Sequence, residues 1–358
     1  MELPVGLATP VLCCDLDRLE DNLREMASAT AAVGLSLRPH AKTHKCVEIA
    51  ERQLALGAVG LTVATVGEAE VFAAAGVEDL FVAYPVWADE DRRLRLRRLA
   101  ERTRLSVGVD SVGGAEALGR VGVPLSVLVE VDSGLHRSGV PPTGTRAVAR
   151  AAIDAGLDVV GVFTFPGHAY APGAAPQAAT DEGRALGEAA SLLAEDGLDV
   201  AVRSGGSTPS AHLADPTVVT EVRPGVYAFN DAQQLELGVV GPEDIALVAV
   251  ATVVSRPSPD RFIVDAGSKI LGADRAPWAR GFGWLPAVPH ATVVALAEHH
   301  GVVEVPAASP LRRPLVGEQL AVVPNHVCNA VNLVDELVIT SRGEVLDRWR
   351  VAARGANT

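Results

Sequence analysis

A lysine flanked by histidines stands out in the segment from Arg38 to Lys45, which reads RPHAKTHK. Lys42 lies two residues after His40 and two before His44. The segment follows a short apolar run that predicts a β-strand, and an amine at the carboxyl end of such a strand can form a Schiff base with a carbonyl group. An isolated lysine there would more simply be a solvent-exposed strand end. The neighbouring histidines favour a site, so Lys42 is the first candidate catalytic residue.

A loop rich in glycine and hydroxyl groups follows a later predicted strand. From Arg203 to Ser210 the chain reads RSGGSTPS. Glycines let backbone amides approach an anion, and Ser and Thr hydroxyls add donors, so such a loop can hold a phosphate. Many surface turns have a similar composition. The inference depends on the position of the loop after the seventh predicted strand, where barrels place phosphate sites.

A histidine and a cysteine lie two residues apart in the segment 324–329, which reads PNHVCN. We expect a β-strand here, which would place His326 and Cys328 on one face. Imidazole and thiolate form a ligand pair suited to zinc, and two protein ligands leave positions for water or substrate. A histidine and a buried cysteine also share a strand face by chance, so the pair alone is weak evidence for a metal.

The elements that must position these residues alternate in type between residue 37 and about residue 230. Short β-branched runs alternate with stretches of helical length, which is typical of βα units around a parallel sheet. Eight such units close a TIM-type (β/α)8 barrel, the fold class that we predict. The expected strands are 37–40, 61–65, 80–84, 105–110, 126–132, 159–165, 200–204 and 226–229.

After residue 243 the pattern changes to β-rich runs without regular helices. We therefore predict a barrel domain at 17–242 and a C-terminal, mostly-β domain at 243–358 that carries the candidate metal pair. The run 9–16 lies outside the count of eight strands, and we expect it to join the β domain.

Composition excludes several classes of protein. The chain has 31 Lys and Arg against 44 Asp and Glu, a formal net charge of −13, which argues against a nucleic-acid partner. Its N-terminus has no basic segment followed by an apolar one, and no apolar run reaches about 18 residues, so we expect no secretion signal and no membrane partner. Four cysteines are too few for a disulfide scaffold and indicate reduced thiols in the cytoplasm.

Taken in order along the chain, the Lys42 segment, the GGSTPS loop and the His-Val-Cys segment resemble the fold-type III pyridoxal phosphate enzymes. Within that family they resemble the D-threonine aldolase and D-serine dehydratase group. The resemblance runs from about Thr9 to Gly355. It implies an alanine racemase-like fold and a homodimer. It also implies two cofactors, pyridoxal 5'-phosphate and a divalent metal, with zinc expected first and manganese or magnesium as alternatives.

The resemblance also implies roles for individual residues. Lys42 matches the lysine that holds pyridoxal phosphate, and His168 matches a histidine proposed as a catalytic base in the aldolases. His326 and Cys328 match the metal ligands. Arg137 matches an arginine beside the cofactor ring. The other residues expected at the cofactor are Tyr170, Ser204, Gly205, Gly206, Ser207, Thr208 and Tyr227.

Within the group the motifs point in two directions. Cys328 and the GSTPS spelling resemble the dehydratases, whereas the segments 332–337, 347–349 and 353–355 resemble the aldolases. The first expectation is a lyase of the D-threonine aldolase type, which cleaves β-hydroxy-D-amino acids to glycine and an aldehyde. The alternative is a D-serine dehydratase type, which forms a keto acid and ammonia. A non-catalytic pyridoxal phosphate carrier is disfavoured by the residues after 243, and an amino-acid racemase by the metal pair.

Overall fold

The computed structural model describes residues 2–306 and 313–358. The contacts among them divide the chain into two compact units, each built from several segments. The barrel unit consists of Glu25–Lys42, Ile49–Gly225 and Gly355–Thr358. The β unit consists of the described residues up to Arg24, Thr43–Glu48 and Val226–Arg354. The units change over between Gly225 and Val226, whereas the sequence places this boundary at 242/243.

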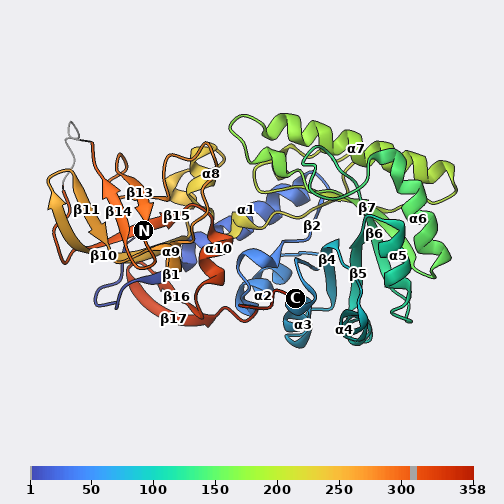
Figure 1. Cartoon of the computed structure of the whole chain (residues 1–358), viewed down its shortest axis with the longest axis horizontal. Coiled ribbons are helices and arrows are strands. Elements are labelled where there is room, and N and C mark those ends of the chain that lie inside the picture. The colour runs from blue at the N-terminus through green and yellow to red at the C-terminus, as the bar shows by residue number, and fades with distance from the viewer. Residues whose placement is uncertain (1, 307–312) are drawn as a thin grey trace. The chain divides into compact units, whose positions relative to one another are not determined.

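An eight-stranded parallel sheet forms the barrel within the described residues (Figure 1). Its strands pair in the order β2-β9-β8-β7-β6-β5-β4-β3. A parallel bridge from His40 to Thr62, with a hydrogen bond from the Thr62 N–H to the Pro39 carbonyl at 2.8 Å, links β2 to β3. The predicted barrel class is thus confirmed. The strands are β2 (Ser36–Leu37), β3 (Leu61–Val63), β4 (Asp79–Pro85), β5 (Arg104–Val109), β6 (Ser126–Glu130), β7 (Asp158–Phe163), β8 (Val202–Gly205) and β9 (Glu221–Val222).

Helices connect the successive barrel strands from β2 to β8, as the alternating pattern predicts. Side chains at the helix starts cap several of them: Asp89, for example, accepts the Arg92 N–H at 2.9 Å at the start of α4. Helix α6 packs on β6 and β7, and α7 packs on β7 and β8. The helices are α1 (Leu16–Ala32), α2 (Val47–Ala55), α3 (Val66–Ala74), α4 (Glu90–Ala100), α5 (Val112–Gly119), α6 (Thr145–Asp154) and α7 (Ala175–Glu195).

The eighth barrel strand lies earlier in the chain than predicted. The expected strand 226–229 is wrong: Val226–Ala228 forms a 3-10 turn, and β9 at Glu221–Val222 completes the sheet. The strand is two residues long and begins with a buried carboxylate, so it has no apolar alternation to detect. Glu221 accepts hydrogen bonds from Arg38 at 2.7 Å and from the Ser204 hydroxyl at 2.6 Å, which makes its burial tolerable.

The β unit contains a nine-stranded sheet among the described residues, in the order β13-β14-β11-β10-β1-β16-β17, with β15 paired to β10 and β12. Strand β1 (Val11–Asp15) pairs antiparallel with β10 and parallel with β16, so the N-terminal strand lies inside this sheet. The others are β10 (Leu247–Ser258), β11 (Arg261–Val264), β12 (Gly283–Trp284), β13 (Thr292–Leu296), β14 (Gly301–Glu304), β15 (Gln319–Pro324), β16 (Glu336–Ser341) and β17 (Glu344–Arg350). Short helices are α8 (Ala232–Glu236), α9 (Ser268–Leu271) and α10 (Val327–Asn332).

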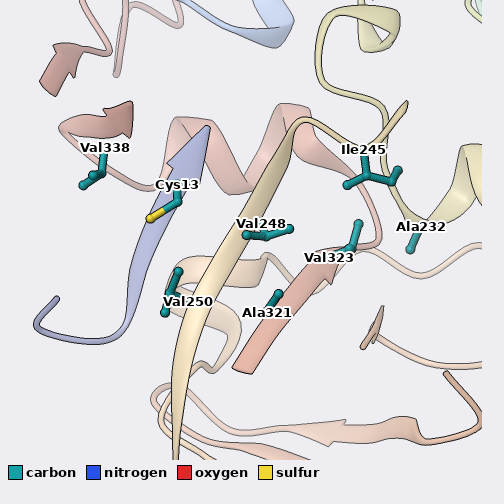
Figure 2. Packing of buried hydrophobic residues seen from close by; sticks show 8 residues of the cluster. All are labelled: Cys13, Ala232, Ile245, Val248, Val250, Ala321, Val323 and Val338. Atoms are coloured by element: carbon teal, nitrogen blue, oxygen red, sulfur yellow. The ribbon is translucent and has the colours of Figure 1, made fainter. Parts of the chain in front are cut away.

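Alternate residues of neighbouring strands build the core of the β unit (Figure 2). Val248 and Val250 of β10 face Ala321 and Val323 of β15, and Cys13 of β1 joins them. Because side chains alternate across a strand, each pair separated by two residues lies on one face. This packing holds β15, which leads directly into the segment that carries His326 and Cys328.

None of the described helices combines the length and the apolar character needed to cross a bilayer.

Candidate functional site

Lys42 lies in a 3-10 turn, Ala41–Thr43, that follows β2. The backbone before it is held to the barrel, because the His40 N–H donates to the Pro224 carbonyl at 2.9 Å. Below the turn, Arg38 forms ion pairs with Asp79 at 2.5 Å and with Glu221 at 2.7 Å. The lysine therefore projects from a backbone that the barrel makes rigid.

Lys42 lines a cavity of about 580 Å³ in the barrel unit, a volume suited to a small molecule. The Lys42 Nζ lies 5.7 Å from the centre of the Phe165 ring, and the Arg137 guanidinium carbon lies 5.2 Å from the same centre. An amine and a guanidinium thus share one aromatic wall. The other lining residues are His40, Ala64, Thr65, Ala83, Tyr84, Pro85, Asp110, Ser138, Gly206 and Arg223.

Arg223 is a residue of this cavity that sequence reasoning missed. It is buried, donates to the Ser204 hydroxyl and to the Thr164 carbonyl at 2.5 Å each, and lies over the Phe81 and Phe163 rings. Burial lowers the pKa of its guanidinium, and neighbouring carboxylates oppose that effect. The side chain supplies positive charge to the cavity. Its only sequence signal is its place directly before the Pro-Gly pair that precedes Tyr227.

The predicted phosphate loop begins at the end of β8, and its residues from Ser204 to Thr208 are all buried. Gly206 has φ +75°, and a Cβ there would come 2.8 Å from the Cβ of Val222. The Ser207 and Ser210 hydroxyl oxygens lie 2.8 Å apart and tighten the turn. Because Gly206 and Lys42 line the same cavity, the barrel unit brings together two of the features picked out from the sequence.

His168 and Tyr170 both lie just after β7, at the 3-10 turn Gly167–Ala169, but in different surroundings. The Tyr170 and Phe165 ring centres are 6.3 Å apart, so Tyr170 packs near a side chain that lines the Lys42 cavity. His168 is not among the residues that line this cavity. Its Nε2 lies 3.7 Å from the Asp181 carboxylate, and neither ring nitrogen has a hydrogen-bond partner among the described residues.

Tyr227 belongs to the β unit. It lies in the 3-10 turn Val226–Ala228, and 4% of its surface is exposed.

The segment of His326 and Cys328 is a helix start and not the predicted strand. Strand β15 ends at Pro324, His326 is extended with φ −137°, and Cys328 lies in the first turn of α10. The Asn325 amide donates to the Gly281 carbonyl at 2.6 Å, a contact that turns the chain out of the sheet. The predicted strand over His326 and Cys328 is wrong, yet the extended His326 at the start of the helix still brings the two side chains together.

Imidazole and thiol interact directly in this pair. The charge on Cys328 raises the pKa of His326 well above its usual range, burial opposes this, and Asp231 adds to it. The His326 Nδ1 lies 3.4 Å from an Asp231 oxygen, and the Cys328 Sγ lies 3.3 Å from the Thr43 hydroxyl. Each of the two side chains therefore has its own buried polar neighbour.

The pair supplies two ligand atoms of types that zinc accepts. Within residues 2–306 and 313–358 no group of three or more His, Cys, Asp or Glu is arranged to hold a metal ion. The Asp231 oxygens, besides lying near His326, accept the N–H groups of Gln234 at 3.0 Å and Val327 at 3.2 Å. A carboxylate beside the second ring nitrogen is the usual support of a metal-binding histidine. The donor set fits an open site completed by solvent or substrate.

Comparison with known proteins identifies the family to which the chain belongs. The family model "Alanine racemase, N-terminal domain" matches residues 14–233, and "Putative serine dehydratase domain" matches residues 246–340. The chain belongs to the fold-type III pyridoxal phosphate enzymes. A D-threonine aldolase of Arthrobacter sp. is 37% identical over 97% of this chain and 93% of its own. D-threo-3-hydroxyaspartate dehydratase of Delftia sp. (strain HT23) is 36% identical over 90% of this chain and 91% of its own.

A solved fold-type III structure agrees with the architecture described above. A mutant of D-threo-3-hydroxyaspartate dehydratase in the metal-free form superposes with a TM-score of 0.89 at 32% identity, over 98% of this chain and 99% of that one. The predicted alanine racemase-like fold and the membership of the D-threonine aldolase and D-serine dehydratase group are confirmed.

Proposed function

We propose that the chain is a lyase that uses pyridoxal phosphate and a divalent metal to cleave β-hydroxy-D-amino acids, with D-threonine aldolase chemistry. The observation that carries the proposal is the barrel cavity in which Lys42, Arg137 and Gly206 meet. The D-threonine aldolase that aligns over nearly the whole chain supports the aldolase type.

The residues of the cavity fit pyridoxal phosphate. The Lys42 amine would hold its aldehyde, and Gly206, whose left-handed conformation and close approach to Val222 admit no Cβ, would lie beside its phosphate. Ser204, Gly205, Ser207 and Thr208 would complete the phosphate contacts. When bound, the cofactor supplies an electron sink for bonds broken at the substrate α-carbon.

The cavity residues then have separate tasks. With the cofactor bound, the Lys42 Nζ would accept or donate a proton in the cavity. The guanidinium groups of Arg137 and Arg223 would donate hydrogen bonds to a substrate carboxylate or to an oxygen on the cofactor ring. Their fixed positive charge would orient that group in the cavity. The Phe165 ring beside Lys42 keeps water away from the amine. We also propose Tyr170 and Tyr227 as cofactor contacts.

The His326 and Cys328 pair would hold the divalent ion, with zinc favoured by the nitrogen and sulfur donors and manganese or magnesium as alternatives. A bound cation lowers the pKa of a substrate hydroxyl. His168 is the proposed acceptor of that proton, directly or through water. Asp231 would keep the His326 ring in one orientation, and Thr43 would donate its hydroxyl to the Cys328 sulfur.

One observation favours a second function, a D-serine dehydratase type of β-elimination. The sulfur ligand Cys328 resembles the dehydratases, and a dehydratase of hydroxyaspartate aligns at 36% identity. In this reaction Lys42 would take the α-proton, the β-hydroxyl would leave as hydroxide, and a keto acid and ammonia would form.

A product analysis separates the two functions. The protein, loaded with pyridoxal phosphate and Zn²⁺ or Mn²⁺, is incubated with D-threonine, D-serine and D-threo-3-hydroxyaspartate. The proposal expects glycine and an aldehyde from D-threonine. Keto acid and ammonia from every substrate would instead establish the dehydratase, and interconversion of D- and L-alanine without metal would indicate a racemase.

Two further features of the family remain proposals for this chain. We propose a homodimer, which light scattering coupled to size-exclusion chromatography would test. None of the described cysteines forms a disulfide, and three of them are buried, which agrees with the proposed cytoplasmic location.

A further inference from the structure

A fully buried carboxylate lies against the glycine loop of the barrel unit. Glu182, on α7, accepts the Gly206 N–H at 2.5 Å through its Oε1. A Cβ added at Gly205 would come 1.9 Å from that same oxygen, so only glycine leaves room for the acid. The contact between α7 and the loop therefore requires a glycine at position 205.

The second carboxylate oxygen of Glu182 has no hydrogen-bond partner within the described residues, although it is buried. Arg223, which follows β9, is the charged group that faces Glu182 from another element. The loop 204–210 contains no charged residue. On α7 itself the neighbouring Asp181 is paired with Arg184. Burial raises the pKa of Glu182 to about 7, against the effects of the Gly206 N–H and Arg223.

We propose that Glu182 is a positioning residue of the phosphate loop and that it takes up one proton from solvent when a phosphate group binds there. This inference rests on the proposed function, which places the phosphate of the cofactor in the loop. An ionised carboxylate behind the loop would repel a phosphate dianion strongly in so dry a setting. The protonated acid loses that repulsion, and its carbonyl oxygen still accepts the Gly206 N–H.

A purely structural acid makes a different prediction. If Glu182 only supported the turn at Gly206, its protonation would be the same with and without phosphate. Cofactor binding would then release or take up the same number of protons whether residue 182 can ionise or not.

Calorimetry on the cofactor-free enzyme distinguishes these cases. Pyridoxal phosphate is titrated at about pH 8 in two buffers of different ionisation enthalpy, which gives the proton uptake per cofactor. We expect the wild type to take up nearly one proton more than Glu182→Gln. Its dissociation constant should rise roughly tenfold per pH unit above pH 7 relative to that variant. Glu188→Gln, an exposed acid of the same helix, is the matched control and should behave as the wild type.

Pyridoxal, which lacks the phosphate, completes the test. It should bind with no difference in proton uptake between the wild type and Glu182→Gln. Equal uptake of protons by the two proteins with pyridoxal phosphate would overturn the inference, as would extra uptake with pyridoxal.

An infrared difference spectrum of the wild type serves if Glu182→Gln does not fold. Pyridoxal phosphate, but not pyridoxal, should add the carbonyl stretch of a protonated carboxyl group, and absence of that band overturns the inference. A folded wild type that binds no pyridoxal phosphate would overturn the proposed function together with this inference. Binding without extra protons overturns the inference alone.

Discussion

The Lys42 cavity and the His326 and Cys328 pair are built in different ways. The cavity has walls from the ends of many barrel strands, and Arg38, two residues before His40, is ion-paired with Asp79 and Glu221. The pair is carried by a single segment at the start of a six-residue helix. The barrel cavity has the volume for a small molecule, whereas the pair supplies only two ligand atoms, and no third His, Cys, Asp or Glu among the described residues joins them as a metal ligand. The two regions should therefore respond differently to the loss of one residue.

The largest effect is expected from Lys42→Ala. Removing the amine should abolish the visible colour of the cofactor complex and lower kcat by roughly a thousandfold or more, because no other residue of the cavity offers a nucleophilic amine. Absorbance and turnover of D-threonine measure both. Lys269→Ala changes an exposed lysine paired with Glu298 and should stay coloured and active. A coloured Lys42→Ala protein would show that the cavity does not hold the cofactor in the way proposed.

His326→Ala and Cys328→Ala test the other side of the comparison. Each should lower metal affinity and turnover by roughly a hundredfold or more while leaving the colour intact, since the proposed function assigns the metal to this pair and the pyridoxal ring to the barrel cavity. Metal content after dialysis and activity at increasing Zn²⁺ are the measurements. His212→Ala, an exposed histidine, is the control. Full metal retention in both variants would show that His326 and Cys328 are not the metal ligands.

A smaller effect is expected from Thr43→Val, which removes the hydroxyl 3.3 Å from the Cys328 sulfur. The outer contact should be worth about tenfold in metal affinity, and Thr43→Ser should restore it. Competition with a chelating dye gives the affinity, and the cofactor spectrum checks that the neighbouring Lys42 is undisturbed. Equal affinities of the three proteins would show that Thr43 only fills space.

The smallest effect on turnover is expected from Glu182→Gln near neutral pH. This substitution should instead change the free energy of unfolding. The carboxyl pKa is raised from its ordinary 4.5 to about 7 in the folded chain. The unfolded chain therefore loses its proton first, and the folded wild type is destabilised progressively between about pH 4.5 and 7. Above pH 7 the variant should be more stable by up to about 3 kcal/mol, and below pH 4.5 the difference should vanish. Thermal unfolding across this pH range tests the sign, and a variant that is less stable at pH 8 would contradict it.

Most of the barrel could be predicted because its strands are runs of β-branched residues followed by turn signals. Strand β9 could not, since it consists of Glu221 and Val222 and its carboxylate is stabilised by Arg38, 183 residues away in the sequence. The helix start at Cys328 escaped prediction for the same reason. It depends on Asp231 accepting the Val327 N–H and on Asn325 reaching Gly281.

The parts of the candidate site that could be predicted from the sequence are Lys42 and the glycine loop, because each combines a reactive or anion-binding residue type with a recognisable motif. Arg223 and Glu182 carry no motif. Their significance comes from burial and from partners on other elements, which spacing along the chain does not encode.

The central claim, that Lys42 carries the cofactor, can be tested directly by chemical trapping. The wild type is loaded with pyridoxal phosphate, reduced with borohydride to convert the Schiff base to a stable amine, digested, and mapped by mass spectrometry. The account predicts a phosphopyridoxyl group on the peptide that contains Lys42. A label confined to Lys45 or Lys269, or no label in a protein that remains folded, would contradict it.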